Sequence, residues 1–163
     1  MNIFVVDTNP DTAARQVCDQ HVVKMPVETA QMLATALHLL GRGERWLWRP
    51  AYQAHPCTVW VRKSKANFEW TLAHGFGLCD EYERRFGRLH AAHDQLLIVS
   101  SLASLMPDTA WPQLSCTAHA QAMPPEHKRV CAVEAYRGYY RTKRWARWLY
   151  TERPTWLECY VGD

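Results

Sequence analysis

Apolar residues recur at every third or fourth position over most of the chain, which is the spacing of one buried face of an α-helix. Clusters that contain proline or glycine interrupt this pattern. Residues 108–126 contain three prolines and little periodicity, so they predict a long ordered loop or two short turns. The remaining periodic segments predict helices at residues 10–25, 27–41, about 58 or 64 to 86, 91–106 and 127–150.

The stretch NIFVV at residues 2–6 is short and apolar, so it predicts a single strand or an extended arm tucked between helices. One strand cannot form a sheet, and the sequence has no Asn-Gly or Asp-Gly hairpin signal. We therefore predict an all-α fold, in which residues 1–163 form a single compact domain of four to five helices with an extended N-terminal arm.

The first predicted helix has a clear start signal and an interior proline. Asn9 is a suitable N-cap, and Pro10 fits the first helical position. Pro26 lacks an amide proton and its ring collides with the carbonyl four residues earlier, so we expect a kink or a restart there. The helix should therefore run from Pro10 through His21 and bend just after Met25.

The segment CDQHVVKMPVE at residues 18–28 places several reactive side chains in an apolar stretch. Residues three, four and seven apart share a helix face, so His21, Lys24 and Glu28 should point the same way. Glu28 can exchange a proton with water or a sugar, and His21 titrates near neutrality, so they are a candidate acid/base pair. The simpler interpretation is a surface helix in which Lys24 and Glu28 form an ordinary ion pair. The valines and Pro26 around these groups favour a functional site, because polar groups in apolar surroundings are costly unless paired or used.

A zinc site is a second interpretation of the same segment. Cys18 and His21, together with His55 and Cys57, offer two sulfurs and two nitrogens. Structural zinc sites more often contain two Cys-x-x-Cys pairs, so we prefer an alternative without a metal. In this alternative His55 lines the same pocket as His21, and Cys57 is buried.

Charge is distributed unevenly, although the formal net charge is only +3. Residues 128–153 contain eight Lys and Arg residues against two acids. A basic surface suits a polyanionic partner, and aromatic rings between the cations suit unstacked bases. The simpler alternative is a solvated helix face whose rings belong to the core.

The 163 residues, 48% of them hydrophobic, are enough for one folded domain. No run of 18 apolar residues occurs, and the first residues do not resemble a signal peptide, so we expect a cytoplasmic protein with no membrane partner. The six cysteines are then expected to be free thiols. We also expect a monomer without a cofactor.

Two motifs resemble the endonuclease V type pyrimidine-dimer DNA glycosylases. Asp-Gln-His at residues 19–21, followed by Glu28, resembles the family's opening motif, and RPTW at residues 153–156 resembles its closing motif. The opening is also similar to a phage and bacterial branch of such proteins. The resemblance implies a compact all-α domain that acts on double-stranded DNA, with Glu28 as the catalytic acid and His21 in the site. It also implies that Arg153 and Trp156 lie near the DNA-binding face.

The sequence departs from the family pattern at the nucleophile. The resemblance implies the α-amine of a small residue exposed by removal of the first methionine, whereas the second residue here is Asn2. Arginines that flank the glutamate in the family are replaced by Val27 and Gln31. Three nucleophiles therefore remain open: water, which we favour, the Lys24 amine and the amine of Met1.

With water as nucleophile, Glu28 would be assisted by Asp7 or Asp19 and the product would be an abasic site. An amine would give a bifunctional glycosylase and AP lyase. The expected substrate is a damaged or modified pyrimidine, including a pyrimidine dimer or a hypermodified phage base removed in antiviral defence. The alternative is a nucleic-acid-binding protein without enzymatic activity. We expect the substrate and DNA to be contacted by His55, Asn2, Arg62, Lys63, Lys65, Arg144, Arg147, Arg153 and Trp156.

Overall fold

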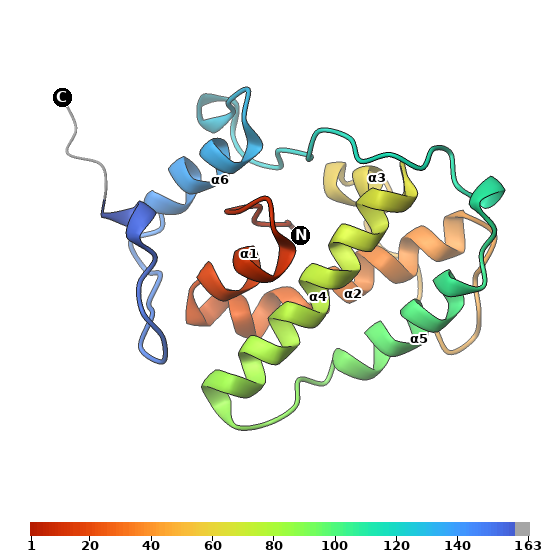
Figure 1. Cartoon of the computed structure of the whole chain (residues 1–163), viewed down its shortest axis with the longest axis horizontal. Coiled ribbons are helices and arrows are strands. Elements are labelled where there is room, and N and C mark those ends of the chain that lie inside the picture. Colours follow the sequence, from red (N-terminus) through yellow and green to blue (C-terminus); the bar gives the residue numbers. More distant parts are fainter. Residues whose placement is uncertain (159–163) are drawn as a thin grey trace.

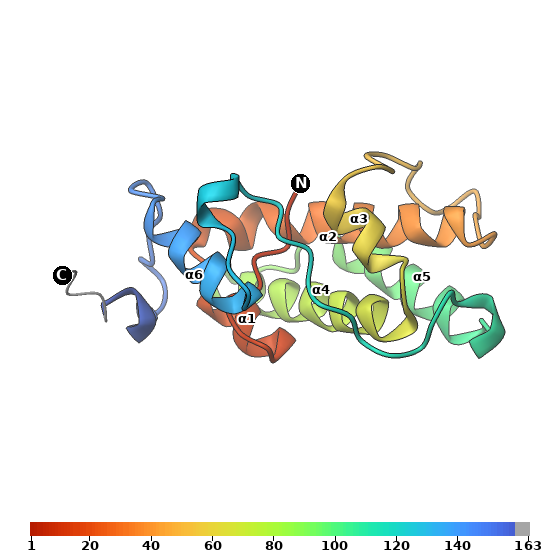
Figure 2. The same cartoon turned by 90° about the horizontal axis from the view of Figure 1, so that it is seen from above.

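Two long helices, α2 (Asp19–Leu39) and α4 (Lys65–Phe86), pack along each other and form the frame of the molecule (Figures 1 and 2). The computed structural model describes residues 1–158, and within them six α-helices and no strand are found. This confirms the all-α prediction, although six helices exceed the four or five expected. The other helices are α1 (Pro10–Gln16), α3 (Pro56–Val61), α5 (His93–Ser104) and α6 (Ala132–Arg141), with short 3₁₀ turns at Asp108–Ala110, Pro125–His127 and Thr155–Leu157.

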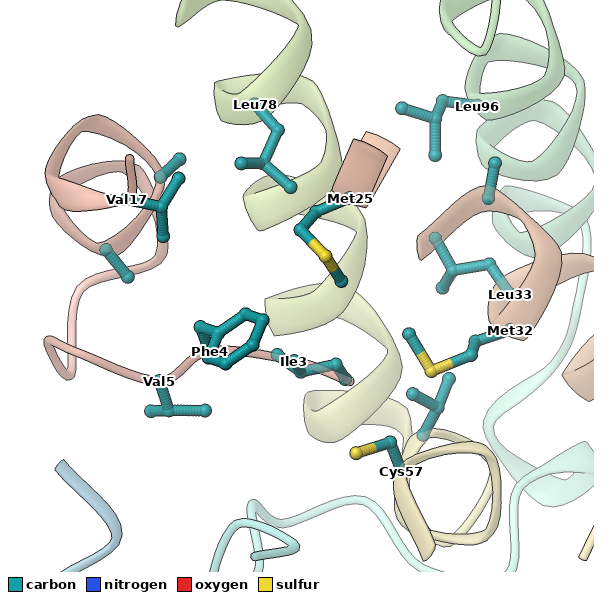
Figure 3. Close-up of a cluster of buried hydrophobic side chains, with 14 of the residues drawn as sticks. Ile3, Phe4, Val5, Val17, Met25, Met32, Leu33, Cys57, Leu78 and Leu96 are labelled. Atoms are coloured by element: carbon teal, nitrogen blue, oxygen red, sulfur yellow. The ribbon is translucent and has the colours of Figure 1, made fainter. Parts of the chain in front are cut away.

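The first residues form an extended arm that runs through the interior of the molecule. Ile3, Phe4, Val5 and Val6 are all buried, and none of them belongs to a strand. Figure 3 shows Ile3 and Phe4 in the same apolar cluster as Met25 of α2. This burial fixes the start of the chain against α2, because apolar side chains removed from water hold the arm in place.

The break between the first two helices lies at Val17 and Cys18, so our prediction of one helix as far as Met25 was wrong. Val17 has extended backbone angles, and its carbonyl accepts a hydrogen bond from the Arg85 guanidinium at 3.0 Å. Arg85 also donates to the carbonyl of Arg15, while the amide of Asp19 donates to the carbonyl of Arg147. These bonds replace the ones that would join the two helices into one.

Of the two alternatives expected at Pro26, the restart is wrong, because α2 continues through this residue, and the kink stays a prediction. The missing proline amide leaves the preceding turn one hydrogen bond short. In that turn, the carbonyl of Val23 accepts a hydrogen bond at 3.1 Å from Nε2 of His90, whose other ring nitrogen accepts from the amide of Ala92. A side chain from outside the helix thus binds its backbone close to the proline.

The last helix is much shorter than the predicted segment 127–150. The amide and the carbonyl of Arg129 are both bound by the side chain of Gln121, which prevents an earlier start. After α6, the chain folds back onto the first residues of α2: Arg147 bonds to Gln20 and Asp19, and the amide of Leu149 donates to Asp19. Residues 142–150 therefore complete the start of α2 rather than extend α6.

The other predicted helices and the long loop agree closely with the structure. The two alternative starts near residues 58 and 64 correspond to two elements, because α3 ends at Val61 and Ser64 caps α4 with its side chain. Helix α5 ends before Pro107, and residues 108–126 form a loop with one short 3₁₀ turn at its start and a second that begins at Pro125. No helix in residues 1–158 is long and apolar enough to span a membrane.

Candidate active site

A cleft of about 270 Å³ opens where the N-terminal arm meets α2 and the segment after α6. It contains a carboxylate, several amines and aromatic rings, and thus combines groups that can transfer protons with groups that can bind a base or a phosphate. The residues that line it are Met1, Asn2, Phe4, Gln20, His21, Lys24, Met25, Glu28, Lys143 and Trp145.

Glu28 contacts three nitrogen atoms. Its Oε2 accepts a hydrogen bond from the main-chain nitrogen of Asn2 at 2.9 Å and lies 3.7 Å from the amine of Met1. Its Oε1 pairs with Nζ of Lys24 at 3.2 Å. The carboxylate is 15% exposed and the Met1 side chain 4% exposed, whereas the Lys24 side chain is 70% exposed. The predicted shared face of the helix is therefore present, with the start of the chain as an additional partner.

The side chain of Asn2 fixes the start of the chain beside Glu28. Its Oδ1 accepts from the hydroxyl of Tyr136 at 2.8 Å and from the amide of Ile3 at 2.9 Å. Its Nδ2 donates to the carbonyl of Ala122 at 2.9 Å. Since Tyr136 is fully buried in α6, the contact between the Asn2 nitrogen and Glu28 is held by a rigid part of the fold. The side chain that we expected to contact DNA thus binds the protein itself.

His21 lies between aromatic rings at the wall of the cleft. Its ring stacks on Phe4 with centroids 4.1 Å apart, and it meets the edges of Tyr140 and Trp145 at 5.2 and 5.3 Å. Burial, followed by the positive charges of Lys143 and Lys24, lowers the pKa of His21 to about 3. The imidazole is therefore neutral at physiological pH, which differs from the titration near neutrality that the sequence predicted.

A second hollow, of about 490 Å³, adjoins the cleft through Lys143, which lines both. Arginines dominate its lining, and no acid is among the residues that form it. Arg144, Arg147 and Arg153, which we expected to contact DNA, all belong to this hollow and are exposed. Such a surface suits the phosphates of a strand whose nucleotide enters the cleft.

Trp156 has a different position. It is 8% exposed, and its ring nitrogen donates to Gln16 at 2.7 Å. The ring meets Tyr140 edge-on, and the guanidiniums of Arg137 and Arg141 lie over it at 5.5 and 6.0 Å. Most of its surface is used in packing the C-terminal segment against α1 and α6.

His55 is close to the cleft but does not line it. Its Nδ1 accepts from the amide of Cys57 at 3.2 Å and so caps α3. Burial lowers the pKa of His55, the amine of Met1 lowers it further, and Glu28 acts in the opposite direction. His55 therefore lies within the electrostatic range of the two central groups of the cleft.

The three cations at the α3–α4 junction lie away from the cleft. Arg62 donates to the carbonyl of Gln53, and Arg62 and Lys63 line a separate hollow. Lys65 pairs with Asp108 at 2.8 Å and with Glu69 at 3.9 Å, so its charge is already compensated. None of the three is among the residues that line the cleft.

The zinc interpretation finds no support in residues 1–158, where no group of three or more His, Cys, Asp or Glu side chains is arranged to hold a metal ion. Cys18 is buried at the start of α2, and its amide donates to Tyr140 at 2.8 Å. Cys57 is buried as we expected, and burial raises the pKa of its thiol to about 11.

Sequence reasoning missed two residues of the cleft wall. Lys143 and Trp145 line the cleft together with the α2 residues, and Nζ of Lys143 lies 5.4 Å from the Phe4 ring and 5.7 Å from the Trp145 ring. The alternation of cations and rings near the C-terminus was the available signal. It did not identify these two residues, because the predicted long helix gave no reason for residues 143–145 to turn toward α2.

Comparison with known proteins identifies one relationship. The family model for pyrimidine dimer DNA glycosylase matches residues 1–95, which include the arm, His21, Lys24 and Glu28. No curated protein and no solved structure matches the chain.

Proposed function

Because the chain belongs to the pyrimidine dimer DNA glycosylase family, we propose that it removes a damaged or modified pyrimidine from double-stranded DNA, with Glu28 as the catalytic carboxylate. The observation that carries this proposal is the contact of Glu28 with the Asn2 nitrogen at 2.9 Å and with the Met1 amine at 3.7 Å. A carboxylate beside an amine supplies a proton carrier and a nucleophile at the same point.

The proposed nucleophile is the amine at the start of the chain, carried by Met1 or, after removal of that residue, by Asn2. The amine nitrogen attacks C1′ of the sugar, and the bond between C1′ and the base breaks. Glu28 takes one proton that the amine loses and gives it to the departing base. The bond between C1′ and the ring oxygen then breaks, the ring oxygen takes the second proton of the amine, and the opened sugar remains bound as a Schiff base. Loss of a proton from C2′ and departure of the 3′ phosphate then cleave the strand.

From the sequence we favoured water as the nucleophile, but the same contacts support an amine instead. They also support the terminal amine over Lys24, because the Lys24 side chain is 70% exposed and the Met1 side chain only 4%. In this proposal Lys24 pairs with Oε1 of Glu28 and so orients the carboxylate.

The second hollow, which is lined by Arg144, Arg147 and Arg153, would hold the DNA backbone during this reaction. C1′ becomes accessible only when the duplex is bent or the nucleotide leaves the stack, and phosphate contacts next to the cleft offset the energy of unstacking. Trp145, which is half exposed at the rim, offers a ring on which the displaced base can stack.

Mass spectrometry of released bases tests the proposal. In ultraviolet-irradiated duplex DNA, a dimer base cut from its own sugar stays joined to the neighbouring pyrimidine by the cyclobutane ring, so we expect its release after the dimers are photoreversed. Untreated and phage-modified DNA are the parallel substrates. Glu28→Gln should lower the release by about a hundredfold or more while DNA binding persists. Glu69→Gln is the matched control, because Lys65 and Glu69 form the same i, i+4 pair on an exposed helix face, outside the cleft.

Borohydride reduction separates the nucleophiles. A trapped protein–DNA complex should form with wild-type protein and with Lys24→Ala, and peptide mapping should find the cross-link at the first residue of the chain. An active preparation without a trapped complex would leave only hydrolysis by water. If none of the three DNAs loses a base and Glu28→Gln binds DNA as well as the wild type, the protein is a nucleic-acid-binding module and the proposal is wrong.

A further inference from the structure

The hydroxyl of Tyr140, in α6, joins the main chain at the start of α2 to the ring of His21. It accepts a hydrogen bond from the amide of Cys18 at 2.8 Å, and its oxygen lies 2.5 Å from Nδ1 of His21. Tyr140 is 1% exposed and His21 is 6% exposed, so neither group exchanges this bond for water. The bond connects two residues that are 119 positions apart.

The donors and acceptors of this group determine where its protons lie. The amide of Cys18 can only donate, so the Tyr140 oxygen is its acceptor and the hydroxyl proton must point elsewhere. The neighbours that can receive that proton are the imidazole nitrogen of His21 and the sulfur of Cys18, and a thiol sulfur is a weak acceptor. The hydroxyl therefore donates to Nδ1, and a neutral imidazole then carries its own proton on Nε2.

The second ring nitrogen of His21 is the one that the cleft can reach. Within residues 1–158, Nε2 has no hydrogen-bond partner. It is also not among the polar atoms that are both buried and unpartnered, so it is accessible from the cleft. The lowered pKa of His21 keeps the ring neutral, and the Phe4 and Trp145 rings hold it in one orientation. Positive charge is already supplied to this cleft by Lys24, Lys143 and the amine of Met1, whereas an uncharged donor is supplied by His21.

We propose that Tyr140 is a positioning residue that fixes His21 as the Nε2–H tautomer, so that the histidine presents an uncharged hydrogen-bond donor to an oxygen atom of the nucleotide in the cleft. The role of the donor rests on the proposed glycosylase function, but the tautomer does not. Tyr140 lies outside residues 1–95, the part that matches the family model.

Nitrogen NMR of the uniformly ¹⁵N-labelled full chain tests the tautomer without any substrate. In the wild type at pH 7 we expect Nε2 of His21 to be protonated and Nδ1 to be unprotonated. Tyr140→Phe removes the donor to Nδ1, so the proton should then be shared between the two nitrogens. Tyr82→Phe is the matched control: Tyr82 is also buried, and its hydroxyl accepts a bond from Arg88 at 2.9 Å outside the cleft.

Base release tests the positioning role. Tyr140→Phe should lower kcat about tenfold, the size expected for one well-placed hydrogen bond, with little change in the Kd for DNA. In a His21→Ala background the same substitution should cause no further loss, because Tyr140 acts through the histidine. Tyr82→Phe should leave both the tautomer and kcat unchanged.

Two results would overturn the proposal: a wild-type spectrum in which Nδ1 carries the proton, or losses from Tyr140→Phe and His21→Ala that simply multiply. The wild-type spectrum decides the first point even if Tyr140→Phe fails to fold. If the Nε2–H tautomer is found but no DNA loses a base, the glycosylase function is wrong while the tautomer assignment stands.

Discussion

Replacement of Arg85 by methionine should strongly destabilise the protein. The Arg85 side chain is 0% exposed and pairs with Asp19 at 2.9 Å and with Glu81 at 2.6 Å. It also donates to the carbonyls of Arg15 and Val17 at the break before α2. Methionine has a similar length but no donor, so all of these groups lose a partner at once.

The two carboxylates would be affected differently. Glu81 keeps its bonds to Arg84, whereas Asp19 keeps only the amide of Leu149. Removing one partner of a buried ion pair costs about 3–5 kcal/mol, because the other charge stays buried without compensation. At about 2–4 °C per kcal/mol for a domain of this size, we expect the midpoint of thermal unfolding to fall by about 10 °C.

Arg84→Met is the matched control. Arg84 binds the same carboxylate of Glu81, but its side chain is 54% exposed, so its ion pair should contribute less than about 1 kcal/mol. Urea denaturation at pH 7, followed by far-ultraviolet circular dichroism, measures both variants. The double variant Arg85→Met with Asp19→Asn should regain part of the loss, since it removes the uncompensated charge. Equal losses for Arg84→Met and Arg85→Met would refute the reasoning.

Two further predictions concern buried titratable groups. Burial lowers the pKa of His74 to about 4. As the pH falls below about 6.5, the unfolded chain therefore binds a proton at this residue before the folded protein does. We expect this to lower the free energy of unfolding by about 2 kcal/mol at pH 5. Denaturation curves measured at several pH values should show a weaker pH dependence in His74→Gln. Burial raises the pKa of Cys57 to about 11, so iodoacetamide at pH 8 should label the exposed Cys116 and leave Cys57 unmodified, as peptide mapping would show; rapid labelling of Cys57 in folded protein would contradict its burial.

The fold could be predicted from the sequence where local patterns decide it. The apolar period of three to four residues identified the long helices, and Asn9 and Pro10 begin α1 as predicted. The ends of helices failed where a distant residue binds the backbone. Arg85 breaks the helix before Asp19, and the side chain of Gln121 stops an early start of α6. Such bonds have no local signature, because the donor is far away in the sequence.

The candidate site shows the same division. Helical spacing alone brought His21, Lys24 and Glu28 to one cleft, because all three lie on α2. Spacing could not place the amine of Met1 beside Glu28, since this contact depends on the path of the arm through the core. It also could not find Tyr140, because this residue and His21 are 119 positions apart in the sequence.

The cleft is therefore formed by two parts of the chain, of which only the first matches the family model. Glu28, its amine partner and His21 come from the segment that matches the family model, whereas Lys143 and Trp145, which also line the cleft, lie beyond residue 95. Attack at C1′ makes the same demands whichever pyrimidine leaves, because the sugar is the same. The identity of the base changes only what touches its ring and its substituents. In the proposed reaction, the groups that act on the sugar thus come from the first 28 residues and are positioned by Tyr136 and Tyr140, and we expect the choice of base to depend on Lys143 and Trp145.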